Sequence, residues 1–335
     1  MRRARHNKTK HNRMPTLVTA ILLAVIGAGL LCLFLWERKQ GPETVPEDEI
    51  PGQLIVNYQG AQYRNRSDLD TFLIMGVDKF TDTVSDPTFY MNNQQADFLL
   101  LMIVDKSSKS YCALHINCDT MAEIQRLGLK GEKLNTFTGQ LALAHTYGSG
   151  GKDSCRNQVQ AVSRYLYDVP IDHYFAMTMD GLGVLNDLVG GVTVHIDDDF
   201  SAVDPSLTQG KDVTLHGDQA LHFVRYRKDV ADQSNLSRMV RQREFMNALY
   251  KQLSAKLKEN DRFARQLATN LSEYTLSDLT TDELSRFADD FKDYEFTGIL
   301  TIPGEAVKGE TFMEFYPDEA ALQELVIKLF FKKMG

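Results

Sequence analysis

The sequence predicts one α/β domain, with a mixed central β-sheet flanked by helices, preceded by a single N-terminal transmembrane helix. An uncharged run of about twenty residues, from Leu17 to Trp36, indicates the anchor because it is long enough to cross the hydrocarbon core. Near-continuous apolar runs at 71–77 and 98–104 are typical of strands covered on both faces. Helical patterns alternate with these strands without a linker-like interruption after Asn65, as in layered α/β domains.

The N-terminal tail is strongly basic. The first fourteen residues carry six basic side chains and no acidic one. Because the cationic flank of a membrane segment stays in the cytoplasm, we expect a cytoplasmic tail at 1–14, a single-pass anchor in the cell membrane at 15–36, and an extracytoplasmic C-terminal domain. A cleaved signal peptide is the alternative, but the segment exceeds the usual apolar core of such peptides and lacks a small-x-small site before Glu37.

A polar stretch follows the expected anchor. Residues 37–66 contain Pro42, Pro46 and Pro51 and a short acidic run, so they are predicted to form an extracytoplasmic linker. The folded domain is then expected at 67–335.

The remainder of the chain is acidic. The formal net charge is −8, so the six cations of the tail leave a charge of about −14 on the other residues. Such a body is a poor ligand for nucleic-acid phosphates, and we exclude nucleic acid as a partner. The cysteines expected outside the membrane, Cys112, Cys118 and Cys155, match no zinc-binding spacing; one disulfide with a free thiol and three buried thiols both stay open.

The first three predicted strands form a hairpin arrangement. A strand at 98–104 is followed by a turn at 106–109 and a third strand at 110–116. A hairpin returns the chain to the edge from which it started, so the end of the third strand lies beside the start of the second. Further elements are expected as helices at 140–147, 154–166, 180–188, 236–257 and 318–332, and as strands at 192–196 and 298–302.

Three acidic side chains are thereby gathered at one edge of the sheet. Asp97 precedes the second strand and Asp119 follows the third. Asp78 joins them if the first strand is antiparallel to the second. A lone aspartate at a strand end is more often a cap or turn residue than a metal ligand, but clustered carboxylates suit Mg²⁺.

Basic residues are concentrated on two adjoining elements. Arg225 and Arg227 are two apart in a strand-like segment and are expected to project from one face. Asn235 is expected to cap the helix that follows. One side of that helix carries, at i, i+3 and i+4, Arg238, Arg241 and Gln242. Ion pairs with neighbouring acids or a solvated helix face would explain the pattern in structural terms, whereas arginines beside clustered aspartates describe a metal–pyrophosphate site.

The order and spacing of these motifs resemble the LytR-CpsA-Psr family. The resemblance runs from about Asp68 to the C-terminus and includes the N-terminal anchor. The matching segments are Asp70–Asp78, Ala96–Leu99, His115–Thr120, Lys133–Asn135, Gly190–Val194, Gly217–Leu221, Val224–Arg227 and Arg238–Gln242.

The resemblance implies a function and a set of site residues. Similar proteins bind a polyprenyl-pyrophosphate glycopolymer, with the lipid inside the domain and the pyrophosphate held by arginines and Mg²⁺, and transfer the polymer to peptidoglycan. Asp78 and Asp97 match the catalytic and Mg²⁺-binding positions. The positions matched to pyrophosphate binding are Lys133, Arg225, Arg227, Arg238 and Gln242. Asp119, Arg241 and Cys118 are further candidates.

One position departs from the family pattern. Where the family has Arg-Asp-Thr, this chain has Cys118-Asp119-Thr120, so a permanent cation is replaced by a thiol. Cys118 as a nucleophile with His115 is disfavoured, because residues three apart on a strand face opposite sides.

Three functions therefore stay open. The first is a glycopolymer phosphotransferase or ligase, with pyrophosphatase activity as a variant, acting on teichoic acid, capsule or a similar polymer. The second is a non-catalytic member that binds the lipid or the cell wall. The third is an anchored structural protein.

Overall fold

The computed structural model describes residues 54–334, apart from 81–90, 93, 261, 281–282, 284–285, 288–289 and 292. The predicted tail and anchor lie outside the described residues. Within the described part, no helix is both long enough and apolar enough to cross a membrane.

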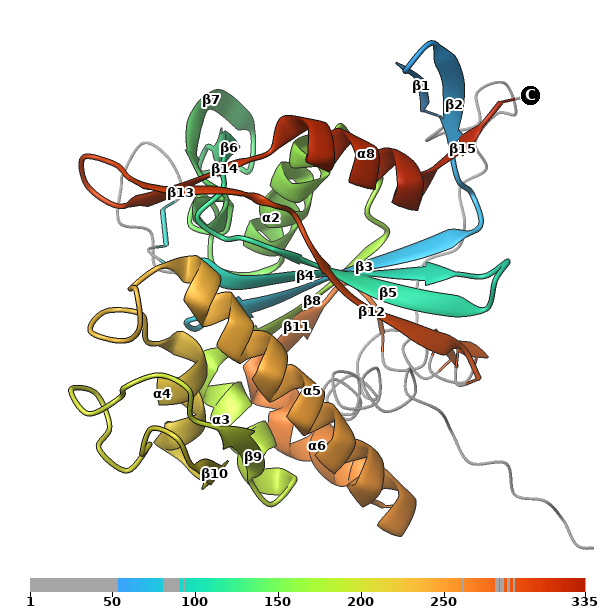
Figure 1. The fold of residues 1–335 in the computed structure, drawn as a ribbon. Coiled ribbons are helices and arrows are strands. Elements are labelled where there is room, and N and C mark those ends of the chain that lie inside the picture. The colour runs from blue at the N-terminus through green and yellow to red at the C-terminus, as the bar shows by residue number, and fades with distance from the viewer. Residues whose placement is uncertain are drawn as a thin grey trace, which may run out of the picture.

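The centre of the domain is a six-stranded mixed sheet (Figure 1). One of its two central strands is antiparallel to both of its neighbours. Each of these neighbours is parallel to the next strand outward. In spatial order the strands are β11 (Thr275–Ser277), β8 (His173–Thr178), β3 (Leu69–Val77), β4 (Ala96–Asp105), β5 (Ser110–Ile116) and β12 (Glu295–Thr301). The predicted fold class, and the hairpin that joins the second and third predicted strands, are confirmed.

Helices cover both faces of this sheet, as Figure 1 shows. The face drawn uppermost packs against α2 (Lys152–Tyr165), α8 (Glu319–Phe330) and the short helix η1 (Leu141–Ala144). The opposite face lies against the 25-residue α5 (Asn235–Glu259). The same side of the sheet also carries three further helices and a small sheet. They are α3 (Met179–Leu188), α4 (Asp218–Arg225), α6 (Phe263–Leu271), and the pair β9 (Val192–His195) and β10 (Asp212–Leu215).

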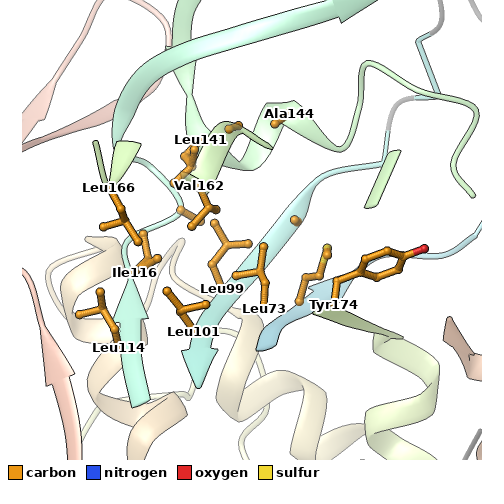
Figure 2. Packing of buried hydrophobic residues seen from close by; sticks show 14 of the residues in the cluster. Leu73, Leu99, Leu101, Leu114, Ile116, Leu141, Ala144, Val162, Leu166 and Tyr174 are labelled. Carbon is orange, nitrogen blue, oxygen red and sulfur yellow. The ribbon is translucent and has the colours of Figure 1, made fainter. Parts of the chain in front are cut away.

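The side chains of β4 divide between the two faces. Leu99 and Leu101 point toward α2 and pack in the main core with Leu73 of β3, as Figure 2 shows. Their neighbours Phe98 and Leu100 lie on the α5 side, where they line a cavity. Because successive strand residues face opposite ways and both faces are covered, the strand is apolar along most of its length.

Two hairpins extend the sheet edge that carries the predicted acids. They are β6 (Met121–Leu127) with β7 (Lys133–Gln140), and β13 (Gly304–Lys308) with β14 (Met313–Pro317). The short helix η2 (Ser272–Tyr274) precedes β11.

The predicted linker at 37–66 is wrong in its described part. Residues 54–66 contain β1 (Ile55–Tyr58) and β2 (Ala61–Asn65), and β2 also pairs with the C-terminal β15 (Phe331–Lys333). The prolines that suggested a linker all precede residue 54, whereas the turn between the strands is Gln59–Gly60, where both φ angles are positive as in tight hairpins.

The strand expected around Arg225 and Arg227 is also wrong. Arg225 ends helix α4, and the chain becomes extended only at Tyr226. Ala220, Phe223 and Val224 are buried at helical spacing in the core behind α5, so tertiary packing outweighs the β-forming character of the aromatic and branched residues.

Smaller differences concern element ends. The helix expected at 140–147 is only the single turn η1, and the strand at 192–196 pairs with β10 outside the main sheet. The N-cap of α5 is Ser234, whose hydroxyl accepts a hydrogen bond from the backbone N–H of Ser237, while Asn235 is the first helical residue.

The buried hydrogen bonds of Asn157 in α2 are predicted to stabilise the fold. Its buried amide donates hydrogen bonds to the carbonyls of Gln125, Ala144 and Tyr147 and so joins α2 to the adjacent hairpin. Asn157→Leu leaves these carbonyls without their donor and should lower the free energy of unfolding by more than about 2 kcal/mol. Urea denaturation measures the effect. Gln160→Ala, on the exposed side of the same helix, should change stability by less than about 0.5 kcal/mol, and an equal loss in both variants would contradict this role.

Candidate functional site

An apolar cavity of about 200 Å³ lies between the central sheet and α5. Strands β3, β4, β5, β8 and β12 form one wall, and α5 forms the other together with residues of α3 and α4. Most of the lining is aliphatic, aromatic or methionine side chains, but one end is polar. Asp97, Arg225, Arg238 and Gln242 lie there. The cavity thus has an apolar interior and one charged end, which we call its mouth.

The predicted acidic edge is present. Asp78 follows β3, Asp97 is the second residue of β4, and Asp119 follows β5 in a turn. Asn117 makes this turn by accepting a hydrogen bond from the backbone N–H of Asp119 at 3.0 Å. The antiparallel order of β3, β4 and β5 therefore collects the three carboxylates at one edge.

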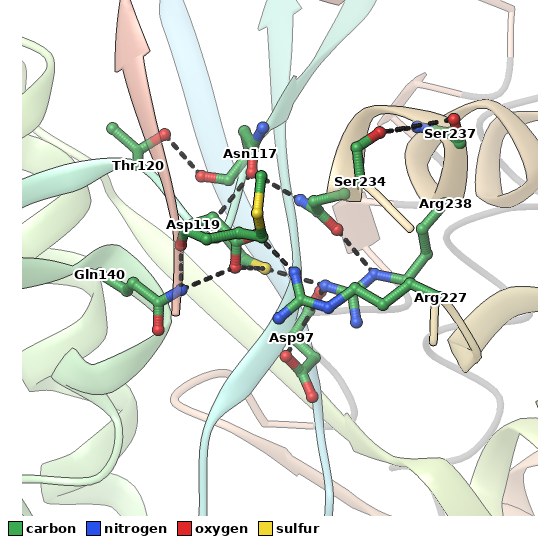
Figure 3. Close-up of polar contacts among 12 residues, drawn as sticks. Asp97, Asn117, Asp119, Thr120, Gln140, Arg227, Ser234, Ser237 and Arg238 are labelled. Atoms are coloured by element: carbon green, nitrogen blue, oxygen red, sulfur yellow. Dashed lines mark hydrogen bonds and ion pairs between the residues drawn. The ribbon is translucent and has the colours of Figure 1, made fainter. Parts of the chain in front are cut away.

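Each of these carboxylates is paired with an arginine from the helical layer. Arg225 Nη2 lies 2.7 Å from Asp78 Oδ1, and Arg238 Nη2 lies 3.7 Å from Asp97 Oδ1. Arg227 forms an ion pair with Asp119 (Figure 3). The two sets of charge thus neutralise each other across the mouth of the cavity.

Arg238 is the most enclosed of these cations, with 4% of the residue exposed. Its Nε donates to Asn235 Oδ1 at 2.6 Å, and its Nη2 lies 3.0 Å from Cys118 Sγ. Asn235 in turn donates through Nδ2 to Asn117 Oδ1 at 2.5 Å (Figure 3). A polar chain therefore fixes Arg238 to the turn that carries Asp119.

Sequence reasoning missed three residues of this network. The sequence predicts Asn117 only as part of a motif and Asn235 only as a helix cap, and it predicts no role for Gln140, which donates to Asp119 Oδ1 at 2.9 Å. Their side chains meet across 118 and 21 residues of chain, and short-range patterns carry no signal for such contacts.

Arg241 and Gln242 fasten α5 to α4. Arg241 Nε donates to the carbonyl of Phe223 at 3.0 Å, and its guanidinium also contacts the Tyr226 carbonyl and Asp198. Gln242 Nε2 donates to the carbonyl of Val224 at 3.2 Å. The final carbonyls of α4, which have no partner within their own helix, are satisfied in this way. Arg241 is therefore committed to structure, whereas Gln242 also lines the cavity.

Lys133 is not brought to the mouth. It is exposed at the start of β7, whereas Gln140, at the other end of the same strand, contacts Asp119. Lys133 therefore lies seven residues along the strand from the contact with Asp119, and its pyrophosphate contact stays a prediction.

Burial in the site disfavours the ionised forms of Asp78, Asp119 and Cys118. Burial raises the pKa of Asp78, with a further rise from Asp97, against the opposing effect of Arg225. Burial likewise raises the pKa of Asp119, and the Arg227 guanidinium opposes this rise. Burial also raises the pKa of the Cys118 thiol well above its usual range, so the thiol stays protonated and uncharged.

Asp78 and Asp97 have the donor chemistry for Mg²⁺. Among the described residues, no group of three or more His, Cys, Asp or Glu side chains is arranged around a common metal position. Mg²⁺ is commonly held by one or two carboxylates together with substrate phosphates rather than by a cage of protein ligands. Asp78, whose pKa is raised by burial and by the neighbouring Asp97 carboxylate, fits that mode of binding together with Asp97.

Comparisons with known proteins identify one family. The LytR_cpsA_psr family model matches residues 45–329. A relative from Bacillus mycoides (strain KBAB4), named polyisoprenyl-teichoic acid–peptidoglycan teichoic acid transferase TagU, is 30% identical over 70% of this chain and 72% of its own length. The protein of the same name from Bacillus cereus (strain AH820) is 28% identical over 79% of both chains.

Solved structures share the fold. B. subtilis TagV aligns with a TM-score of 0.57 and 22% identity, covering 79% of this chain and 96% of its own. TagT bound to LI-WTA aligns with a TM-score of 0.57 and 19% identity, covering 78% of this chain and 90% of its own.

The buried charge of Asp119 is predicted to cost stability. Because its pKa is raised, the folded state holds the proton more tightly than the unfolded chain, so the cost is present above the folded pKa and disappears below the unfolded value of about 3.9. Asp119→Asn keeps an acceptor for Gln140 and should raise the free energy of unfolding at about pH 7. The gain over wild type should shrink as the pH falls to about 4.

Asp232→Asn is the matched control with the opposite sign. Hydrogen bonds from Ser237 and Ser234 lower the pKa of Asp232, so its contribution stabilises the fold above the unfolded pKa and is lost as the pH falls. This variant should be less stable than wild type at neutral pH. Urea denaturation in the presence of a chelator measures both. A destabilised Asp119→Asn would show that the Arg227 pair outweighs the burial cost.

Proposed function

The chain belongs to the LytR-CpsA-Psr family, and we propose that it transfers a polyprenyl-pyrophosphate-linked glycopolymer to peptidoglycan at the outer face of the cell membrane. The observation that carries this proposal is an apolar cavity whose polar end is lined by Asp97, Arg225 and Arg238. Ion pairs of Asp78 with Arg225 and of Asp119 with Arg227 lie beside that end. A lipid with a pyrophosphate head has the two chemistries that such a site recognises.

The cavity supports the lipid part of the proposal. Its walls are apolar apart from the mouth, and burying a hydrocarbon chain in such surroundings contributes about 0.8 kcal/mol per CH₂. A chain that entered from the mouth would run beneath α5 along β4 and β5. Its head would remain at the mouth, beside Arg225 and Arg238.

The arginines support the anionic part of the proposal. Guanidinium groups bind phosphate oxygens through paired N–H donors, and those of Arg225, Arg227 and Arg238 converge on the mouth from α4, the following loop and α5. Each now contacts a carboxylate of the sheet edge. A pyrophosphate would replace these carboxylates as the partner of the arginines.

The released carboxylates then have a catalytic use. Asp78 or Asp97 takes the proton of the attacking sugar hydroxyl. For Asp78 the raised pKa makes the carboxylate a stronger base than an ordinary one. The arginines hold the departing lipid phosphate as its negative charge develops. A Mg²⁺ ion held by Asp78 and Asp97 would supply further positive charge to the phosphate oxygens.

Teichoic acid is the proposed polymer. The relatives that match over most of this chain are named as teichoic acid transferases, and TagT is the protein solved with LI-WTA. A capsular or other polymer with the same lipid pyrophosphate would meet the same cavity and arginines. The N-terminal segment 15–36 is proposed as the anchor that keeps the domain at the membrane surface.

Cys118 favours a second candidate function, in which the protein binds the lipid without turnover. The thiol is fully enclosed and uncharged, at a position where the resemblance to the family implies a cation. It contacts Arg238, so the guanidinium of α5 is the positive charge closest to this point of the turn. A protonated Cys118 also argues against the nucleophile hypothesis, because the thiolate is the reactive form.

Replacing Arg227 or Arg238 by Ala should weaken binding of a polyprenyl pyrophosphate by about 2 to 5 kcal/mol, because a desolvated anion loses its partner. Lys should restore only part of the affinity, since an ammonium lacks the paired donors. Calorimetric titration measures the effect.

Arg66→Ala is the matched control for both variants. Arg66 pairs with Asp68 and Asp105 at the opposite end of β4 from Asp97 and should leave lipid binding unchanged. Wild-type affinity in both mouth variants would assign their arginines to structural ion pairs.

Cys118→Arg tests catalysis against binding. An added cation at a developing phosphate charge is worth about 2 to 4 kcal/mol, and this variant should raise transfer or lipid-pyrophosphate hydrolysis at least about tenfold, with a smaller gain in binding. Because the new guanidinium lies beside Arg238, the lipid-free variant should unfold more easily, and the lipid should restore its stability.

Cys118→Ser, which adds no charge, controls for the loss of the thiol. Both variants are compared with wild type when folded and supplied with Mg²⁺. If Cys118→Arg shows neither activity nor tighter binding, the non-catalytic function becomes the better account.

A further inference from the structure

The small sheet of β1, β2 and β15 places two cations directly opposite each other. Arg64 of β2 pairs with Lys332 of β15 and, on its other side, with Ile55 of β1. Residues that pair directly across strands project from the same face of a sheet, so the three side chains form one row, which we call the basic row. All three residues are exposed, and Ile55 is 51% exposed although it is apolar.

The basic row is unfavourable without an external partner. Like charges directly opposite each other on a sheet repel. Neither Arg64 nor Lys332 forms an ion pair within the described part of the chain. The neighbouring cation Arg66 differs in this respect, because it pairs with both Asp68 and Asp105. An external anion would therefore offset a repulsion that the domain itself leaves uncompensated.

The basic row lies where the chain enters the domain. The other face of the small sheet packs on the main core through Val56 and Tyr63, so the row is on the free face. Ile55 is the first residue of the first strand. Residues 37–54 separate it from the anchor proposed at 15–36, and a segment of this length spans at most about 60 Å. The row is thus the part of the described fold that the anchor tethers most directly to a bilayer.

A bilayer with anionic lipids matches the chemistry of the basic row. Basic side chains are attracted to such a surface within a Debye length. The chain beyond its basic tail carries a charge of about −14, so most of the domain surface is repelled by the same lipids. Ile55 adds an apolar side chain that enters the headgroup region, a contact that a soluble anionic polymer does not offer.

We propose that the basic row docks on anionic lipid headgroups and sets the orientation of the domain on the membrane. The inference rests on the anchor in the proposed function, because the anchor holds the domain beside a bilayer. β3 starts next to this small sheet and ends next to Asp78, so the mouth of the cavity lies at the far end of the strand (Figure 1). Docking through the basic row therefore leaves the mouth uncovered.

A single tryptophan reports the contact. Trp36 is the only tryptophan of the chain, so Trp36→Phe combined with Ile55→Trp places the sole indole in the basic row. The full-length protein is reconstituted into phosphatidylcholine vesicles with brominated acyl chains, with or without added phosphatidylglycerol. Bromine quenches indole fluorescence at short range. Quenching should be strong in the anionic vesicles and weak in the neutral ones.

Arg64→Gln with Lys332→Gln removes both cations from this reporter protein. Each cation near an anionic surface contributes about fivefold in binding, so the ratio of docked to undocked domain should fall roughly 25-fold. Quenching in anionic vesicles should then approach the level in neutral ones. The thermal midpoint of the detergent-solubilised protein should stay the same or rise, since a repulsion is removed.

Two matched controls accompany this variant. Lys211→Gln with Lys251→Gln removes two exposed cations, one before β10 and one in α5, and should leave quenching unchanged. Val307→Trp in place of Ile55→Trp moves the reporter to β13, to an apolar residue that is 43% exposed. This reporter should be quenched in neither vesicle.

The outcomes separate this inference from the function beneath it. Equal quenching of Ile55→Trp in both vesicles, or unchanged quenching after the loss of Arg64 and Lys332, would overturn the role of the cations. Equal quenching of Val307→Trp would overturn the orientation. A blue shift of the Ile55→Trp emission with soluble polyphosphate, absent with anionic vesicles, would assign the row to an anionic polymer instead. Release of the whole protein from the vesicles at alkaline pH would overturn the proposed anchor, and the docking with it.

Discussion

The charge pairing between the sheet edge and the helical layer determines how the site is built. Aspartates at the ends of β3 and β5 and near the start of β4 meet arginines carried by α4, by the loop that follows it and by α5. Pairing the two sets of charge offsets part of the cost of removing each from water at this partly enclosed position. Arg241 and Gln242 support the arrangement by fastening α5 to the end of α4. The mouth is therefore held ready for an anion by groups that neutralise each other until the anion arrives.

The two faces of the sheet differ in packing: one carries the main core and the other lines the cavity. On the α2 side, residues such as Leu101 and Val162 pack in the main hydrophobic core, which supports the strands that carry the acids. On the α5 side, Phe98 and Leu100 line a space that the protein does not fill. Leaving apolar space unfilled costs packing energy, as cavity-forming substitutions show. A long apolar ligand would recover that energy, which is the physical link between the shape of the domain and its proposed substrate.

Sequence reasoning succeeded where a local pattern determines the structure. The strands β3, β4 and β5 could be predicted because they are apolar on both faces and are separated by a recognisable turn, and their order then located Asp78, Asp97 and Asp119.

Sequence reasoning failed where contacts between distant segments decide. Arg225 lies in a helix because Phe223 and Val224 pack into a core contributed by other elements. The Asn117–Asn235 contact joins residues 118 positions apart.

The central claim is that pyrophosphate exchanges with the carboxylates as the partner of the arginines while the lipid fills the cavity. A crystal structure of the protein with a polyprenyl pyrophosphate and Mg²⁺ tests it most directly. The account predicts that Arg225, Arg227 and Arg238 contact phosphate oxygens, that their ion pairs with the aspartates are broken, and that the chain lies between β4 and α5. Intact aspartate–arginine pairs, with the lipid bound elsewhere or the cavity empty, would contradict it.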